Sequence, residues 1–193
     1  MSTAPKVLAF AGSTRKESFN RKLIKHAAAA AEKAGAQVTL IELSDYPMPL
    51  VDQDLEAAQG LPESAQKLKK LMIESSGLLI GSPEYNSSVT PLLKNTLDWI
   101  SRPVKGEPSL VAFQGKIVAM LSASPSPFGG VRSQNHLRAV LSHVGSVVLP
   151  ETVTIPNAHD AFNADGTFKD PKQFERVEKC VGAFVAFLRK TGA

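Results

Sequence analysis

Residues 6–20 read KVLAFAGSTRKESFN, and this stretch decides the fold. Residues 6–12 are almost wholly apolar and end in glycine, a pattern typical of a strand buried on both faces of a parallel sheet. A helical pattern follows, with Ser18 as the expected N-cap, Gly35 just past the end, and apolar residues at helical spacing: Phe19, Leu23, Ile24, Ala27, Ala31 and Ala34. The stretch therefore predicts a strand, a polar loop and the start of a helix.

The same alternation repeats along the chain. Apolar runs predict further strands at 37–43, 77–82, 116–124 and 146–150. Helical spacing and capping residues predict further helices at 62–75, 91–102, 131–144 and from 171 onward. Loops are expected after residue 43 and over 151–169, and Asp170-Pro171-Lys172-Gln173 resembles a capping box.

Five β-α units in 193 residues predict a single domain that spans residues 1–193. Helical crossovers make the strands parallel, so the predicted fold is an open, doubly wound α/β sheet with helices on both faces. Ligands of such sheets bind beyond the carboxyl ends of the strands, near the point where the strand order reverses. The loops after the first, third and fourth strands are therefore the candidate binding loops.

Composition disfavours several classes of protein. The chain has 22 Lys and Arg against 18 Asp and Glu, and the net charge of +4 suits an anionic small ligand as well as nucleic acid. The basic residues cluster only here, without the long stripe of a nucleic-acid binder: Arg15, Lys16, Arg21, Lys22 and Lys25. The single cysteine excludes an internal disulfide, and the N-terminal residues lack the apolar stretch of a signal peptide or membrane span. We expect a cytoplasmic protein that binds neither nucleic acid nor membrane.

Other reactive side chains suit structural roles better. The 4 histidines show no metal-ligand spacing, so no metal site is predicted, and Cys180 is expected to be a buried structural thiol. Trp99 and Asp98 belong either to the core or to a dimer contact. One face of the 131–144 helix is expected in solvent; if it is instead an interface, Arg132 and Glu151 are candidate cross-subunit partners. That face carries Arg132, His136 and His143.

The loop 12–20 has the residues of an anion site. Unpaired backbone N–H groups and the dipole of a helix N-terminus favour a phosphate, to which Ser13, Ser18 and Asn20 can donate further hydrogen bonds. Arg15 would add a charge-assisted bond. The sequence is neither a Walker A loop nor a three-glycine dinucleotide fingerprint. The alternative, that the polar residues only cap the helix and the basic ones lie in solvent, needs fewer such residues than the loop contains.

The loops after the third and fourth strands complete the candidate cleft. In SPEYNSSVTP (82–91), Glu84, Tyr85 and Asn86 could bind a flat heterocycle, although Pro, Asn and Ser also form ordinary turns. In SASPSPFGG (122–130), the paired glycines would let the backbone approach a ligand closely, or would simply allow a strand-to-helix turn. The three loops are predicted at the same end of the sheet, which favours one shared cleft.

Together, GSTRKESFN, GSPEYNSSVTPLLKNTLDW and SPFGG give the chain a resemblance to a known family. Over essentially its whole length it resembles the NAD(P)H-dependent FMN reductases of flavodoxin-like fold, which include quinone, chromate and azo-dye reductases. The resemblance implies the strand order 2-1-3-4-5, noncovalent FMN, and a homodimer or homotetramer with the flavin near a subunit interface. It leaves the electron acceptor open.

The resemblance also implies which residues bind the cofactor. Ser13, Arg15, Ser18 and Asn20 would bind the FMN phosphate, with Thr14 and Phe19 in the same binding stretch. The flavin ring would contact Pro83, Glu84, Tyr85 and Asn86. The site would be completed by Ser122, Ala123, Ser124, Gly129 and Gly130. Because flavin N5 carries the chemistry, no catalytic side chain and no metal are expected.

The activity implied is hydride transfer from NADPH or NADH to bound FMN, then reduction of a quinone-like or other soluble acceptor in a ping-pong scheme. Arg15 and Lys16 near the cleft favour NADPH because they could attract its phosphates. One alternative is a flavodoxin-type FMN electron carrier that oxidises no nicotinamide, against which the basic balance and Arg15 argue. Another is a non-redox module that binds a nucleotide or a partner protein through the same loops.

Overall fold

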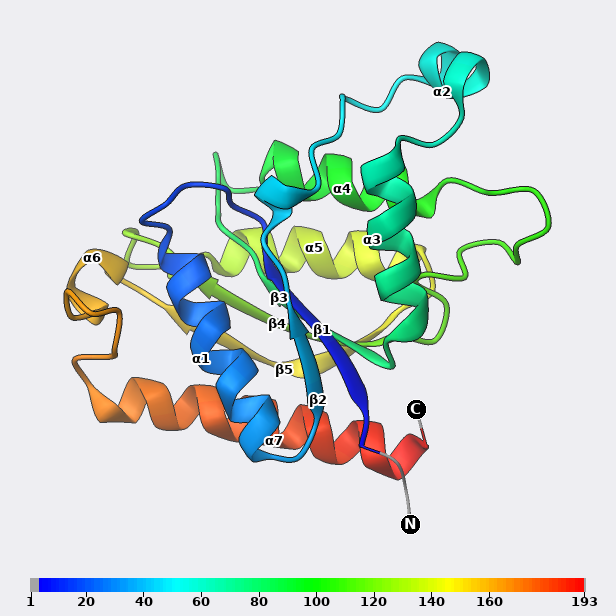
Figure 1. Cartoon of the computed structure of the whole chain (residues 1–193). Coiled ribbons are helices and arrows are strands. Elements are labelled where there is room, and N and C mark those ends of the chain that lie inside the picture. Colours follow the sequence, from blue (N-terminus) through cyan, green and yellow to red (C-terminus); the bar gives the residue numbers. More distant parts are fainter. Residues whose placement is uncertain (1–3, 193) are drawn as a thin grey trace.

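The computed structural model describes residues 4–192 and places five parallel strands in the order β2-β1-β3-β4-β5. The strands are β1 (Lys6–Ala11), β2 (Gln37–Leu40), β3 (Gly77–Gly81), β4 (Ile117–Ala123) and β5 (Val147–Ile155). The helices are α1 (Phe19–Lys33), α2 (Gln53–Gln59), α3 (Glu63–Glu74), α4 (Pro91–Ser101), α5 (Val131–His143), α6 (Ala158–Ala161) and α7 (Pro171–Thr191), with a short 3₁₀ helix η1 (Leu43–Asp45). The order reverses between β1 and β3 (Figure 1), which confirms the expected topology.

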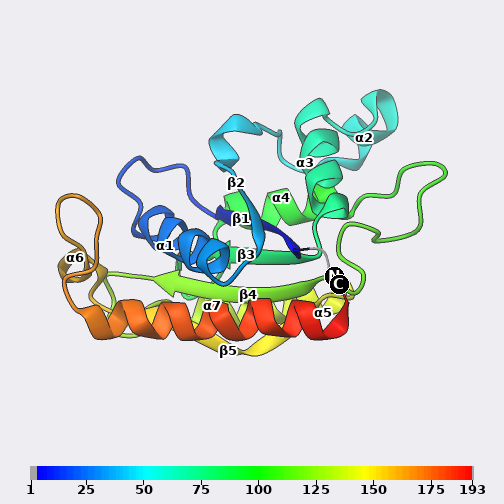
Figure 2. The ribbon, with the colours of Figure 1, turned by 60° about the horizontal axis from the view of Figure 1, so that its bottom comes forward.

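Helices cover both faces of the sheet because successive side chains of a strand point to opposite faces. In β1, Leu8 and Phe10 pack with α3, α4 and α5, whereas Val7, Ala9 and Ala11 pack with α1 and α7. Figure 2 shows α7 running along the sheet on the same side as α1. The central strands β1, β3 and β4 are thus buried on both faces, as their apolar runs predict.

Several predicted caps and core residues are confirmed. The Ser18 hydroxyl accepts a hydrogen bond from the N–H of Arg21 (3.4 Å), and the Thr90 hydroxyl accepts one from Leu93 (3.2 Å). Trp99 is a core residue, fully buried, and its ring N–H donates to the carbonyl of Pro49 (2.7 Å). These caps fix where α1 and α4 begin, and both helices begin at the same end of the sheet.

Other boundaries were predicted wrongly. The edge strand β2 ends at Leu40, not at residue 43, because the chain turns there and buries Leu43 in the core. β5 continues to Ile155, so residues 151–155 are not a loop. The pairing register with β4 shifts between Val118 and Met120, which marks a bulge in the ladder. Pro150 lies at that bulge, where its missing N–H is tolerated. The expected loop also contains α6.

α2 was missed because none of its side chains is buried, which leaves no apolar stripe to detect. It begins where the Asp52 carboxylate accepts hydrogen bonds from Asp54 (2.8 Å) and Leu55 (3.1 Å). The predicted capping box is only half formed. Asp170 caps α7 by accepting from Lys172 (3.0 Å), but within residues 4–192 the side-chain oxygen of Gln173 has no hydrogen-bond partner.

Candidate functional site

The loops that follow β1, β3 and β4 meet at the carboxyl end of the sheet, at the upper left of Figure 1. Between them lies an open cleft of about 180 Å³. All but one of the residues that line it were predicted, the exception being Pro125: Ser13, Arg15, Ser18, Phe19, Asn20, Pro83, Glu84, Tyr85, Ala123, Ser124 and Pro125. Most of the residues that the family resemblance implies for cofactor binding therefore line this one cleft.

The first wall of the cleft is the N-terminus of α1. The Ser18 cap takes the N–H of Arg21, so the N–H groups of Phe19 and Asn20 remain in a first turn that offers them no helical acceptor. The Arg15 guanidinium lies 5.4 Å from the centre of the Phe19 ring, a cation-π contact that keeps its charge beside this turn. The wall thus presents N–H and hydroxyl donors and a positive charge, which suits an anion.

The Asn20 side chain joins two walls of the cleft. It is 3% exposed, its Nδ2 donates to the carbonyl of Ala123 (2.8 Å), and its Oδ1 accepts from the N–H of Ala123 (2.9 Å). These bonds join the start of α1 to the end of β4. The side chain of Asn20 therefore positions the two loops relative to each other.

Arg21 holds the backbone of the loop 12–20 from outside the cleft, a role that the sequence did not reveal. Its Nη1 donates to the carbonyls of Arg15 (3.3 Å) and Lys16 (3.4 Å), and its Nη2 donates to Glu42 Oε1 (2.8 Å). The contact with Glu42 spans 21 residues and no spacing rule points to it. Arg21 thus fixes the backbone of the loop against the segment that follows β2.

The second wall is the loop between β3 and α4. Tyr85 and Ser88 exchange two backbone hydrogen bonds of 3.0 Å each, and Asn86 and Ser87 between them have positive φ of 49° and 66°. This is the two-residue turn of type I′, whose positive φ suits asparagine or glycine but is unfavourable for the serine at its second position. The turn leaves Tyr85 55% exposed at the cleft, while Asn86 lies at the tip of the turn and does not line the cleft.

Glu84 lines the cleft, yet its carboxylate is engaged by α5. Each oxygen accepts two hydrogen bonds: Oε1 from Nε (2.8 Å) and Nη2 of Arg132, and Oε2 from the N–H groups of Arg132 (3.1 Å) and Ser133 (3.2 Å). Burial raises the pKa of this carboxyl, but the hydrogen bonds and the Arg132 charge outweigh it and hold the pKa below its usual value. Glu84 is therefore ionised at neutral pH.

The third wall, between β4 and α5, depends on residues that do not touch the cleft. Ser122 is fully buried, and its hydroxyl donates to the carbonyl of Ser82 (2.6 Å). Gly129 and Gly130 make the turn with φ of 60° and 88°. These three predicted residues support the cleft, and Thr14, also predicted, faces a neighbouring small cavity instead.

Replacing Gly130 with alanine is expected to destabilise this wall by about 1–3 kcal/mol, because a side chain at φ 88° is strained and its Cβ would collide with the Ser122 hydroxyl. Urea denaturation of the apoprotein measures this loss. Gly106→Ala is a useful control, since Gly106 also has positive φ (90°) but its added Cβ would meet nothing within 4 Å. Equal losses in the two variants would mean that the collision with Ser122 is unimportant.

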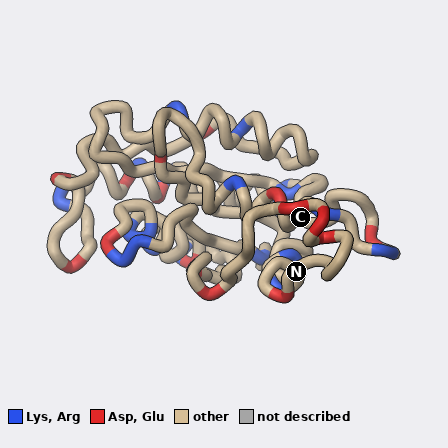
Figure 3. Tube along the Cα trace, turned by 90° about the horizontal axis from the view of Figure 1, so that it is seen from above, with Lys and Arg blue, Asp and Glu red and all other residues tan. Residues whose placement is uncertain are grey.

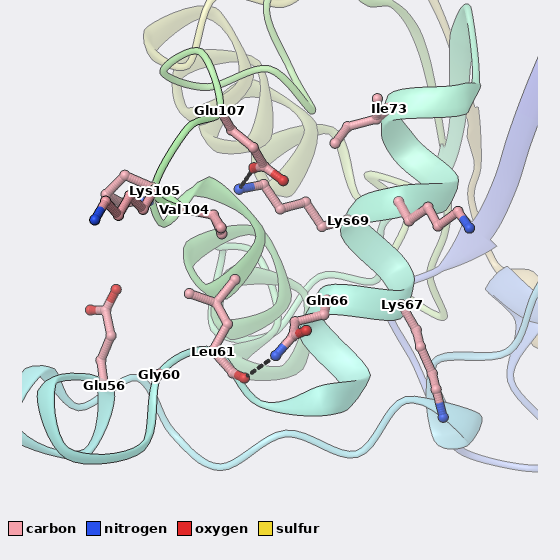
Figure 4. Close-up of a pocket in the computed structure, with 12 residues that line it drawn as sticks. Glu56, Gly60, Leu61, Gln66, Lys67, Lys69, Ile73, Val104, Lys105 and Glu107 are labelled. Atoms are coloured by element: carbon pink, nitrogen blue, oxygen red, sulfur yellow. Dashed lines mark hydrogen bonds and ion pairs between the residues drawn. The ribbon is translucent and has the colours of Figure 1, made fainter.

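A larger cavity lies elsewhere, beside α2, α3 and the segment after α4, and has a volume of about 690 Å³ (Figure 4). Some of its polar groups are already paired. Lys69 forms an ion pair with Glu107 (2.6 Å) and donates to the carbonyl of Arg102 (2.9 Å), and Gln66 donates to the carbonyl of Leu61 (2.8 Å). This cavity is not lined by the loops at the carboxyl ends of the strands, where parallel sheets bind their ligands, so the cleft is the candidate site despite its smaller volume.

Charges elsewhere suggest no competing site. Across the residues drawn in Figure 3, Lys and Arg are interspersed with Asp and Glu. Between residues 4 and 192 we find no group of three or more metal-binding side chains, and none of the helices there is long and apolar enough to cross a membrane. Burial, together with the charge of Glu151, raises the pKa of the Cys180 thiol to about 11, so it is not a nucleophile at neutral pH.

Comparison with known proteins agrees with this geometry. The family model of the NADPH-dependent FMN reductases matches residues 5–160. An NAD(P)H-dependent FMN reductase of Pseudomonas aeruginosa is 34% identical over 192 residues, which cover 98% of each chain. An NADPH:quinone oxidoreductase of Arabidopsis thaliana is 35% identical over 193 residues, covering 97% of this chain and 94% of the plant protein.

A solved structure supports the same assignment. The flavoenzyme NAD(P)H:(acceptor) oxidoreductase FerB of Paracoccus denitrificans superposes with a TM-score of 0.79 at 32% identity, covering 97% of this chain and 98% of FerB. The sequence match agrees with the strand order and with the N-terminus of α1, which suits an anion. The chain belongs to the NADPH-dependent FMN reductase family.

Proposed function

We propose that this protein is an FMN-dependent oxidoreductase that takes electrons from NAD(P)H and delivers them to a quinone-like acceptor. One observation carries the proposal: the first turn of α1, with Ser18 and Arg15, opens into the same cleft as Pro83 and Tyr85. Donors and positive charge at one wall suit the phosphate of FMN, and the apolar and aromatic second wall suits its ring. The residues present therefore fit this cofactor.

In this proposal the protein binds and orients the cofactor, and each wall has its own part. Ser13, Arg15 and Ser18 hold the phosphate together with the backbone of the first turn of α1. Pro83 and Tyr85 lie against the ring, and Ala123, Ser124 and Pro125 close the third side. When bound, FMN supplies the redox chemistry by accepting a hydride from the nicotinamide and passing two electrons to the acceptor. The open cleft admits both substrates in turn.

Three finer points belong to the same proposal. Arg15 and Lys16, both exposed, favour NADPH over NADH through attraction to the additional phosphate. Tyr85 and Phe128, which are 55% and 58% exposed, provide apolar surface near the cleft for a second subunit in a homodimer or homotetramer. A cytoplasmic location is supported by the single, buried and unpaired cysteine.

The test is an anaerobic titration of the protein loaded with FMN. We expect NADPH to bleach the flavin absorbance and 1,4-benzoquinone to restore it, with parallel lines in initial-rate plots and a lower KM for NADPH than for NADH. Bleaching by dithionite but not by either nicotinamide would indicate an electron carrier instead. Intersecting lines would indicate that both substrates bind together.

A further inference from the structure

Glu84 connects the second wall of the cleft to a helix that cannot cap itself. The N-cap position of α5 is Gly130, which has no side chain, so although the N–H of Val131 donates to the carbonyl of Phe128 (3.2 Å), the N–H groups of Arg132 and Ser133 have no capping side chain at that position. Glu84 Oε2, from a loop 48 residues away in sequence, accepts from the N–H of Arg132 (3.1 Å), and also from that of Ser133 (3.2 Å). Glu84, a residue of the loop between β3 and α4, thus caps the N-terminus of α5.

The same carboxylate is almost closed to solvent and forms an ion pair with Arg132, whose own side chain is 46% exposed. The side chain of Glu84 is 4% exposed, and the Arg132 guanidinium that pairs with it stands 5.0 Å from the centre of the Phe128 ring. With two hydrogen bonds at each oxygen, the carboxylate has no free face to offer a ligand. The Glu84 carboxylate can therefore act on the cleft only through the backbone of its own loop.

That backbone needs support. Asn86 and Ser87 follow Glu84 closely and form the type I′ turn, in which the positive φ of Ser87 is unfavourable and persists only where the surroundings fix it. The loop is anchored at its other end too, since the ring Nδ1 of His136, on α5, lies 2.9 Å from the Ser88 hydroxyl. Glu84 and Ser88 thus fasten both sides of the turn to α5.

We propose that Glu84 is a positioning residue, whose clamp onto the N-terminus of α5 and Arg132 holds the Tyr85–Ser88 turn in the shape that receives the flavin ring. This inference rests on the proposed function, because it assumes that the turn meets FMN. It assigns Glu84 an indirect role, in place of direct contact between its side chain and the ring. Loss of the contacts between Glu84 and α5 should weaken the binding of the flavin ring and leave the binding of the phosphate unchanged.

The experiment compares Glu84→Gln with a matched control, Glu56→Gln. Glu56 also pairs with an arginine, Arg102 (2.9 and 2.8 Å), but lies at the large cavity away from the cleft. We expect Glu84→Gln to weaken the binding of FMN and of riboflavin by the same factor, about 3–10-fold, because the turn must then be ordered on binding. The absorbance bands and the reduction potential of bound FMN should shift as well. Glu56→Gln should change none of these.

Arg132→Lys provides a second variant, which keeps the charge but loses the fork that meets Oε1. It should reproduce part of the effect, and hydrogen exchange of the apoprotein should show faster exchange at the Ser88 amide in both variants. Unchanged flavin affinity and potential in Glu84→Gln, with only a lower melting temperature, would overturn the inference while the proposed function stands. A wild-type protein that binds no flavin would overturn both.

Discussion

Replacing Asn20 with alanine is expected to lower the free energy of unfolding by about 2–5 kcal/mol and to abolish retention of FMN during purification. The buried amide makes two hydrogen bonds to Ala123, at 2.8 and 2.9 Å, and its removal leaves a buried backbone N–H and a buried carbonyl unpaired. The same bonds hold the start of α1 against the end of β4. Both the fold and the cleft depend on them, so both should suffer.

Asn95→Ala is the control for this prediction. Asn95 makes the same pair of backbone bonds, to Val51 (2.8 Å) and Pro49 (2.8 Å), but does not line the cleft. Urea denaturation and flavin fluorescence measure the two effects separately. We expect Asn95→Ala to lose stability without losing FMN affinity. An Asn20→Ala protein that unfolds like the wild type and keeps its FMN would contradict the role given to this amide.

The Arg15→Ala variant is expected to bind FMN about 10–100-fold more weakly, with little change in the stability of the apoprotein. Hydrogen bonds between a charged group and a phosphate contribute about 1.5–3 kcal/mol, which corresponds to this range of affinity. Arg15 is exposed and its side chain contacts Phe19 through a cation-π interaction, so the fold depends little on it. Fluorescence titration of the apoprotein with FMN measures the change.

Riboflavin is the control ligand because it lacks the phosphate. Its affinity should be nearly equal in the wild type and in Arg15→Ala, and the penalty for FMN should shrink at high salt. Lys16→Ala, which removes a neighbouring charge outside the cleft lining, should weaken FMN binding less. An equal loss for FMN and riboflavin would mean that Arg15 acts on the ring or on the loop, and not on the phosphate.

The central strands could be predicted from the sequence because strands buried on both faces consist of apolar residues. The strands β1, β3 and β4 are covered on both faces and therefore read as apolar runs, and their order followed from the family resemblance. Capping residues marked the starts of α1 and α4. The binding loops could be located because they follow such strands, and the family resemblance supplied most of the individual residues that line the cleft.

Elements without a buried face, or with an interrupted one, could not be predicted in the same way. α2 buries no side chain, and β5 contains Pro150 at a bulge, which made the strand look shorter than it is. The roles of individual side chains were also hidden. Asn20 and Glu84 turn toward partners 103 and 48 residues away, and spacing along the chain does not encode the direction of a side chain.

The most direct measurement is a crystal structure of the protein with FMN. We expect the phosphate at the N-terminus of α1, bonded to Ser18 and Arg15, with the ring against Pro83 and Tyr85 and the Glu84 carboxylate still paired with Arg132. FMN bound in the 690 Å³ cavity beside α3, or a phosphate that makes no contact with the first turn of α1, would contradict it.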